Sequence, residues 1–188
     1  MNSISIASRR RKLATIEQAN PNARIIDVTS LTSQPWVRFS PFFPHGNIPI
    51  PNTDKITAQS VEGVWQALKV FENEGVDRSK LDITNMKGIK RSVRTRGKVL
   101  GHQFGLDSDE LLDYLSARIK IYLPTYRYIL TNRVTREVSL LREMLEAQPD
   151  VLLDYETNTT VTNLRKPLSH AGLVVAYLTE TWPSSNEA

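Results

Sequence analysis

The segment Ser60–Phe71 (SVEGVWQALKVF) predicts a helix that carries a short polar stripe among apolar faces. Glu62, Gln66 and Lys69 are four and then three residues apart, so they share one face of that helix. Trp65 lies beside them. A carboxylate and an ammonium on a mostly buried helix must be paired with each other or serve a site. The residues of the buried face follow helical spacing and are Val61, Val64, Leu68 and Phe71.

Length and composition indicate a soluble, single-domain protein. A chain of 188 residues with ordinary apolar content predicts one soluble domain with its own core. The chain has no cysteines, which excludes disulfides and thiolate metal sites and fits a reducing cytoplasm. No apolar run is long enough to span a membrane, and the N-terminal charges are ordered wrongly for a secretory signal. We therefore expect a cytoplasmic protein that does not contact membranes.

The predicted elements are mixed in type and predict an α+β fold: a helix-dominated single domain with a small number of short strands. Residues 1–22 are expected to form a mobile basic N-terminal segment, residues 23–182 the single globular domain, and residues 183–188 a disordered tail. A proline-rich loop over residues 40–57 is expected to be stiff and to border a site. The sequence predicts strands at 23–28, 36–39 and 151–155, and helices at 60–71, 108–122, 124–147 and 168–181.

Glu62 is the first candidate for catalysis. A carboxylate beside an amide and a cation can act as a general acid or base, or stabilise the positive charge that develops when a sugar–base bond breaks. Trp65 would offer a flat face to a base. The alternatives are a buried structural ion pair for Glu62 and a plain core aromatic for Trp65.

Further candidates lie later in the chain. Asp154 ends an apolar strand, where an acid can point into a cleft or form a turn. Arg118 and Tyr122 are one helical turn apart, and a guanidinium there suits phosphate, unless it extends to solvent from an apolar helix. His170 could line a site near the start of the last helix or make a structural hydrogen bond. The three histidines lack metal-ligand spacing, so a metal site is not expected.

A basic segment over residues 87–98 supports a second kind of function. It contains no acidic residue and can hold nucleotide phosphates or a nucleic-acid backbone. A solvated loop is the alternative. The candidate nucleic-acid-binding residues are Lys90, Arg91, Arg94 and Arg96.

The order of these segments resembles the NADAR domain, the YbiA-like family. That family has an aromatic opening near FSPF, matched here by Phe39–Phe42, and a helix of the type S/T-x-E-H-x-x-Q-A-x-K-F, matched by Ser60–Phe71. Gly63 stands where the family has histidine. The later strand and helix of the family correspond to Val151–Asp154 and to residues 163–168.

The resemblance implies an N-glycosidase that cleaves an N-ribosyl bond in a nucleotide or ADP-ribose-type substrate, without a cofactor. It implies that Glu62 orients water or stabilises the cation and that Asp154 is a second carboxylate near the sugar. Trp65 would stack on the base, and Lys69 and Arg118 would hold phosphate. Two alternatives remain open: a non-enzymatic nucleic-acid-binding protein, and a ligand-sensing domain on the same fold.

Overall fold

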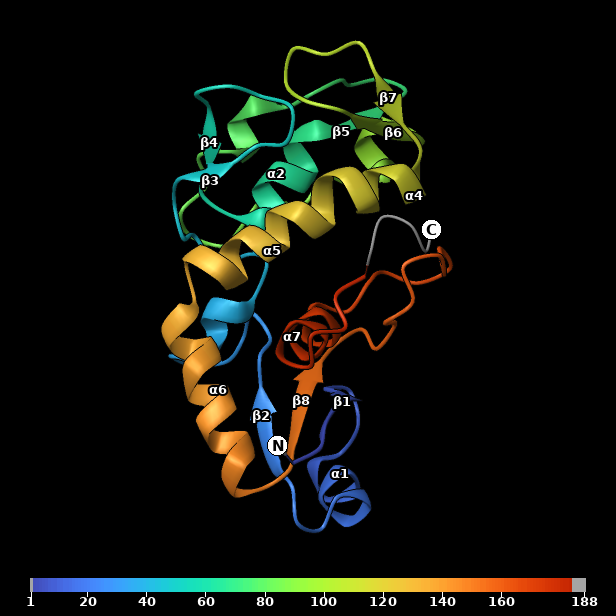
Figure 1. Cartoon of the computed structure of the whole chain (residues 1–188). Helices are drawn as coiled ribbons and strands as arrows, with labels where there is room; N and C mark the ends of the chain where they lie inside the picture. The colour runs from blue at the N-terminus through green and yellow to red at the C-terminus, as the bar shows by residue number, and fades with distance from the viewer. Residues whose placement is uncertain (1, 184–188) are drawn as a thin grey trace. The chain divides into compact units, whose positions relative to one another are not determined.

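A parallel sheet of three strands organises the first of the two units into which the computed structural model divides. Residues 2–183 are described; unit 1 comprises residues 2–40 and 130–183, and unit 2 comprises residues 41–129. Strand β8 (Asp150–Asp154) is central, and β1 (Ile4–Ser8) and β2 (Arg24–Asp27) pair with it on either side (Figure 1). Every residue of β8 is buried, as expected for an apolar strand covered on both faces.

Helices complete unit 1. The helix α1 (Leu13–Ala19) connects β1 to β2, and its Ile16 packs in a core cluster with Ala7, Val151 and Leu153. The helix α6 (Thr135–Ala147) leads into β8. The helix α7 (His170–Leu178) is preceded by Ser169, whose hydroxyl caps it by accepting the N–H of Gly172.

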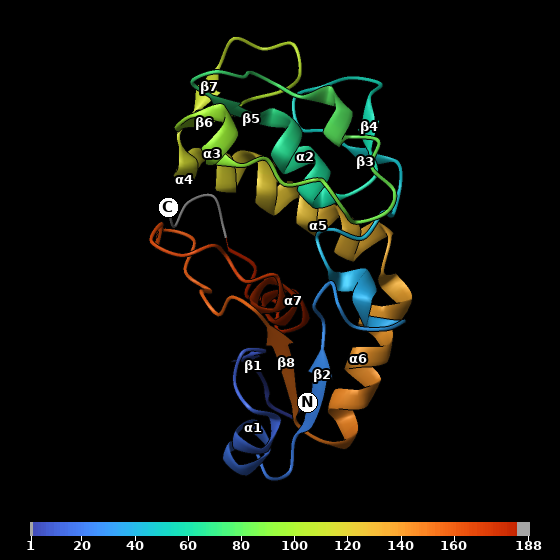
Figure 2. The same ribbon diagram turned by 180° about the vertical axis from the view of Figure 1, so that it is seen from behind.

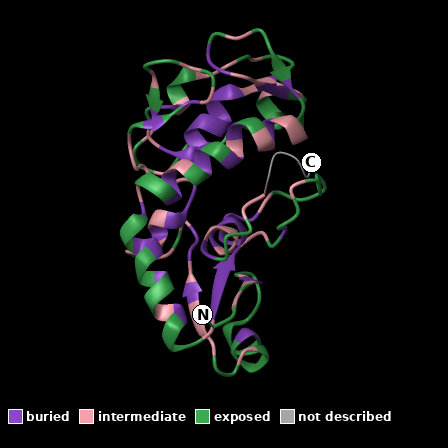
Figure 3. Cartoon of the chain, viewed as in Figure 1, coloured by how far each residue is buried: buried purple, intermediate pink, exposed green. Residues whose placement is uncertain are grey.

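In unit 2 the helix α2 (Val61–Leu68) is buried at all eight positions, as Figure 3 shows by its colour. Ser60 caps it by accepting the N–H of Gly63. The chain then enters an antiparallel sheet of β5 (Lys69–Phe71), β6 (Val99–Gln103) and β7 (Leu111–Leu112), seen from behind in Figure 2. The strands β3 (Ile48–Pro49) and β4 (Thr57–Ala58) form a separate pair.

A continuous helical stretch ends unit 2. It begins with α4 (Tyr114–Ala117), passes through five π-helical residues in η3 (Arg118–Tyr122) and continues as α5 (Leu123–Asn132), of which residues up to 129 belong to unit 2. Single π-helical turns inside α-helices occur frequently at functional sites. Two short elements, the 3-10 turn η2 (Arg78–Lys80) and the helix α3 (Val93–Arg96), lie between α2 and β6 in the chain.

The predicted α+β class is confirmed, while several element boundaries differ. The helix expected over Ser60–Phe71 ends at Leu68, because Lys69–Phe71 pairs with β6 instead. The segment Trp36–Phe39 is the 3-10 helix η1 rather than a strand, with the two terminal aromatic rings stacked. The other differences are a helix that starts at Tyr114 after the cap Asp113 rather than at Ser108, a break between α5 and α6, and a last helix that starts at His170.

The chain termini were expected to be mobile or disordered. The structure places strand β1 within the basic segment 1–22, where Arg9 and Arg10 reach Asp27 and Glu156 respectively. Apart from Pro183, the tail 183–188 lies outside the described residues. Mobility of the N-terminal segment therefore stays a prediction, although Ile4–Ser8 has a full set of partners along β8.

Gly63 is required by close packing against the backbone. A Cβ atom at this position would lie 2.7 Å from the carbonyl oxygen of Lys80. We expect Gly63→Ala to lower the free energy of unfolding by about 2 kcal/mol, because the backbone must shift to admit the methyl group. The matched control is Gly75→Ala, where a Cβ meets nothing within 4 Å. Urea denaturation followed by circular dichroism measures both, and equal stabilities for the two variants would contradict this account.

Candidate functional site

Four aromatic rings gather around α2 in unit 2. The Trp65 ring centroid lies 3.8 Å from that of His102, 5.6 Å from that of Tyr122 and 6.0 Å from that of Tyr114. The Lys69 ammonium lies 5.9 Å from the Trp65 centroid. Trp65 is only 9% exposed, whereas Tyr114 is 38% exposed. The accessible aromatic surface of this cluster is therefore on the tyrosines, and Trp65 supports it from beneath.

Glu62 is held at one oxygen only. Its side chain is 8% exposed, and its Oε1 accepts a hydrogen bond of 2.9 Å from Nε2 of Gln66. Within residues 2–183, its Oε2 accepts no hydrogen bond, and no cation lies within 4.0 Å of the carboxylate. Its backbone N–H donates to the carbonyl of Pro41, which fixes the first turn of the helix. A positioned carboxylate with one oxygen left for another partner has the geometry required of a general base.

Lys69 is near Glu62 without being in contact with it. Burial lowers the pKa of Lys69, the Glu62 carboxylate opposes this only partly, and Arg91 and Lys90 lower the pKa further. Among the described residues, the ammonium has neither a hydrogen bond nor an ion pair. The stripe is therefore not a closed structural ion pair, which was the alternative interpretation of Glu62 and Lys69.

Arg91 orients the Gln66 amide. Its backbone N–H donates to Gln66 Oε1 at 3.0 Å, so that the amide nitrogen points to Glu62. Its guanidinium is buried, donates to the carbonyls of Gln66, Lys69 and Gly75, and forms an ion pair with Glu74. Arg91 is therefore a positioning residue for the Glu62 stripe and does not present its charge to solvent.

Of the other candidate basic residues in segment 87–98, one forms an ion pair within unit 2 and two are exposed to solvent. Arg96 also pairs with Glu74, while Lys90 and Arg94 are exposed. Of the four predicted nucleic-acid-binding residues, two are thus engaged within unit 2. An interface for a nucleic-acid backbone would depend on the exposed cations alone.

Arg118 lies in the π-helical segment and is buried rather than extended to solvent. It is 2% exposed, its guanidinium carbon lies 4.5 Å from the Tyr114 ring centroid, and its Nη2 donates to the Tyr114 hydroxyl at 3.2 Å. Tyr122, at the end of the same segment, packs its ring at 10° to that of Tyr126, with centroids 6.1 Å apart. The two residues thus support the aromatic cluster from the π-helical segment η3.

His102 belongs to this cluster, and the sequence patterns did not point to it. The residue is 1% exposed, and neither ring nitrogen has a hydrogen-bond partner among the described residues. Burial, with the positive charges of Lys69 and Arg91, lowers its pKa to about 3, so the ring is neutral. Register explains its position, because Lys69 of β5 faces His102 of β6. His102 could have been identified from the pairing of Lys69–Phe71 with β6. The pairing was missed because the predicted helix included Lys69–Phe71.

The remaining candidates, Asp154 and His170, lie in unit 1, where they form a closed network. Asp154 Oδ2 accepts the Ser169 hydroxyl at 2.8 Å and the Ala171 N–H at 3.3 Å, and lies 3.0 Å from His170 Nδ1. Its Oδ1 accepts the Tyr155 N–H at 2.7 Å. With both oxygens occupied, Asp154 joins the end of β8 to the start of α7. Glu62 and Asp154 thus belong to different units, and a joint role for them stays a prediction.

His170 has acceptors at both ring nitrogens, since Nε2 lies 2.9 Å from the Val28 carbonyl oxygen. Burial alone would lower the pKa of His170, but the Asp154 carboxylate and the Val28 carbonyl hold it above its usual value. Burial alone would raise the pKa of Asp154, but His170 and the N-terminal groups of α7 hold it below its usual value. At pH 6.5 and below the ring is therefore mostly charged in the folded chain, and the pair is then a buried salt bridge.

The stability of unit 1 should accordingly depend on pH. The His170 contribution is complete below pH 6.5, its unfolded pKa, and is lost as pH rises through the raised folded value. The Asp154 contribution is complete above pH 3.8 and is lost as pH falls through the lowered folded value. We expect the free energy of unfolding to be highest between these limits and His170→Gln to abolish the loss above pH 6.5. Urea titrations across pH 4–9 measure this, and an unchanged alkaline slope in the variant would refute the assignment.

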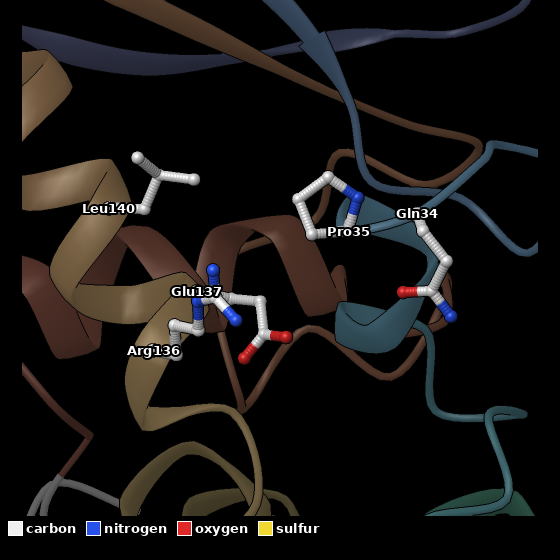
Figure 4. A pocket seen from close by; sticks show the side chains of 5 residues that line it. All are labelled: Gln34, Pro35, Arg136, Glu137 and Leu140. Carbon is white, nitrogen blue, oxygen red and sulfur yellow. The ribbon is translucent and has the colours of Figure 1, made fainter.

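Unit 1 also contains a pocket of about 400 Å³ between the segment before η1 and the helix α6 (Figure 4). Gln34, Pro35, Arg136, Glu137 and Leu140 line it. Glu137 is bound to Arg38 by an ion pair of 2.7 Å. Across residues 2–183 there is no cluster of histidine and acidic residues that could hold a metal ion. In the same range, no helix combines the length and apolar character needed to cross a bilayer.

Comparison with protein families gives a match over most of the chain. The matching model covers residues 8–174 and describes a family of unknown function, DUF6939. The chain belongs to the DUF6939 family. No curated protein matches it.

Membership of DUF6939 overturns the predicted NADAR resemblance. The prediction was wrong because one helix was its only specific part, and the period and polar stripe of that helix can arise wherever a helix is buried on several faces. The departure at position 63 has a structural cause, since a Cβ there would collide with the Lys80 carbonyl and a histidine has no room. In this DUF6939 member, the stripe must be interpreted from its own contacts.

Proposed function

We propose that unit 2 carries the active site of a hydrolase that cleaves the N-ribosyl bond of a nucleotide-type small molecule. The observation that carries the proposal is Glu62: a buried carboxylate fixed at Oε1 by Gln66, unpartnered at Oε2 among the described residues, and close to the unpaired Lys69 ammonium. Buried charges without a partner reduce the stability of the fold, and they are found at sites where a bound ligand supplies the missing partner.

The proposed roles follow from the contacts. Glu62 stabilises the positive charge that develops on the ribose as the C–N bond breaks and its electron pair leaves with the base, which takes up a proton from solvent. Glu62 then takes a proton from the water that forms the new C–O bond. Gln66, fixed by Arg91, holds that carboxylate in one orientation. Tyr114 and Tyr122 present aromatic surface to the base, with Trp65 and the neutral His102 packed behind them. Water and the side chains named above suffice for this hydrolysis. We place the protein in the cytoplasm, in line with the cysteine-free sequence.

The test is incubation of the purified chain with ribonucleoside monophosphates, ADP-ribose and an ADP-ribosylated oligonucleotide. Mass spectrometry then detects the released base and the complementary ribose product. We expect base release from at least one of them at a rate far above that of spontaneous hydrolysis. Tight binding without release would instead favour the ligand-sensing alternative, in which the chain binds the ligand without chemistry.

The exposed part of segment 87–98 supports a second candidate, binding to nucleic acid. Lys87, Lys90, Arg94 and Lys98 are exposed there. This candidate predicts oligonucleotide binding that weakens steeply with salt and is reduced by Arg94→Ala. Substitution of Arg91 is unsuitable for this test, because its guanidinium has three carbonyl partners inside unit 2.

A further inference from the structure

Two ammonium groups lie near the Glu62 stripe without a carboxylate partner. Lys90 Nζ lies 5.2 Å from the centroid of the Phe42 ring, and Phe42 follows Pro41, whose carbonyl accepts the Glu62 N–H at 2.8 Å. Lys69 Nζ lies over the Trp65 ring. Among the described residues, neither ammonium has an ion-pair partner within 4.0 Å. Both cations are therefore attached to the elements that position Glu62.

The scaffold holds these like charges close together. The backbone N–H of Arg91 is fixed by Gln66, so the preceding residue, Lys90, is anchored at the stripe even though its side chain is exposed. The Lys90 charge is near enough to lower the pKa of Lys69. The third cation, Arg91, is neutralised by Glu74 and by backbone carbonyls. Among the described residues, Glu62 is an acidic group whose charge raises the pKa of Lys69. Two positive charges and one negative charge near the stripe leave a net attraction for an anion.

We propose that Lys69 and Lys90 form a phosphate subsite of the Glu62 site and that the substrate accordingly carries a phosphate monoester or diphosphate. The inference rests on the proposed function, since it names the charge of that substrate. An ammonium binds phosphate as a point charge, and two of them suit a dianion better than a singly charged group. Phe42 supplies a flat face that holds Lys90 in place through its cation–π contact.

The experiment uses ligands that contain no base and so cannot undergo the proposed cleavage. Ribose and ribose 5-phosphate are titrated into the full chain, and chemical-shift changes by nuclear magnetic resonance give each dissociation constant. Ribose 5-phosphate should bind at least about tenfold more tightly than ribose, as expected for charge-assisted contacts. Lys90→Ala should remove about tenfold of the ribose 5-phosphate affinity and leave ribose unchanged. The matched control is Lys87→Ala, an exposed lysine of the same segment, which should change neither.

Each failure has a distinct signature. Base release from uncharged nucleosides, with no preference for ribose 5-phosphate, would overturn the subsite and leave the proposed hydrolase intact. Phosphate binding that depends on Lys90, in a chain that releases no base, would support the subsite and remove the hydrolase. Equal losses in Lys87→Ala and Lys90→Ala, with steeply salt-dependent binding of an oligonucleotide, would overturn the subsite in favour of a diffuse polyanion surface.

Discussion

Glu62→Gln is expected to lower the rate of base release by about a thousandfold while leaving the fold intact. The substitution removes the negative charge and the proton-accepting ability of Oε2 and keeps the size of the side chain. It also places an amide next to the Gln66 amide, and the new side chain can turn its oxygen toward Gln66 Nε2, which keeps this hydrogen bond while Arg91 still fixes Gln66. Because no ion pair within 4.0 Å joins the wild-type carboxylate to a cation among the described residues, its removal breaks no salt bridge, although Lys69 loses the acidic charge that raises its pKa.

The matched control is Glu137→Gln. Glu137 is also 8% exposed, but it lies in unit 1 and forms an ion pair with Arg38. This variant should lose stability, because it leaves Arg38 without that carboxylate, and it should retain the rate of base release per folded molecule. The rate is measured by mass spectrometry of released base, with circular dichroism as the test of folding. A Glu62→Gln protein that unfolds, or one that turns over normally, would exclude Glu62 as the catalytic carboxylate.

How far the sequence predicts this site depends on whether local spacing or long-range pairing places each residue. The helical period placed Glu62, Trp65 and Gln66 on one buried helix, because α-helical geometry is determined over a few residues. It failed at Lys69, where pairing with a strand thirty residues later ends the helix. Strand partners are not encoded locally, and so the contribution of His102 could not be predicted from its neighbours.

The difference between local spacing and long-range contacts also explains why the basic segment 87–98 was only partly predicted. A run of positive charges predicts a solvated or anion-binding surface from composition alone. The structure divides that run, since Arg91 enters the interior to bind the carbonyls of Gln66, Lys69 and Gly75. A charged residue is buried only when such partners are supplied by other segments, which composition cannot report. The cations left outside are the ones with which a ligand can interact.

Asp154→Asn is expected to reduce the free energy of unfolding by about 3 kcal/mol, because it leaves the charged His170 ring buried without its carboxylate. An asparagine keeps the volume and one acceptor oxygen, but its amide nitrogen must then face either the Tyr155 N–H or the donors of Ser169 and Ala171. The link between β8 and the N-terminus of α7 is thereby weakened. Urea denaturation at pH 6, where the pair is fully charged, measures the loss.

A double-mutant cycle separates structure from catalysis at this position. If Asp154 and His170 act as one buried pair, then Asp154→Asn and His170→Gln together should destabilise unit 1 by about 1–3 kcal/mol less than the sum of the single changes. Base release per folded molecule should be unchanged in all three variants, since Asp154 has both oxygens occupied within unit 1. Loss of base release from a stable, folded Asp154→Asn protein would reverse this assignment. It would make Asp154 the second catalytic carboxylate that the sequence had suggested, and the network with His170 would then be the device that sets its charge.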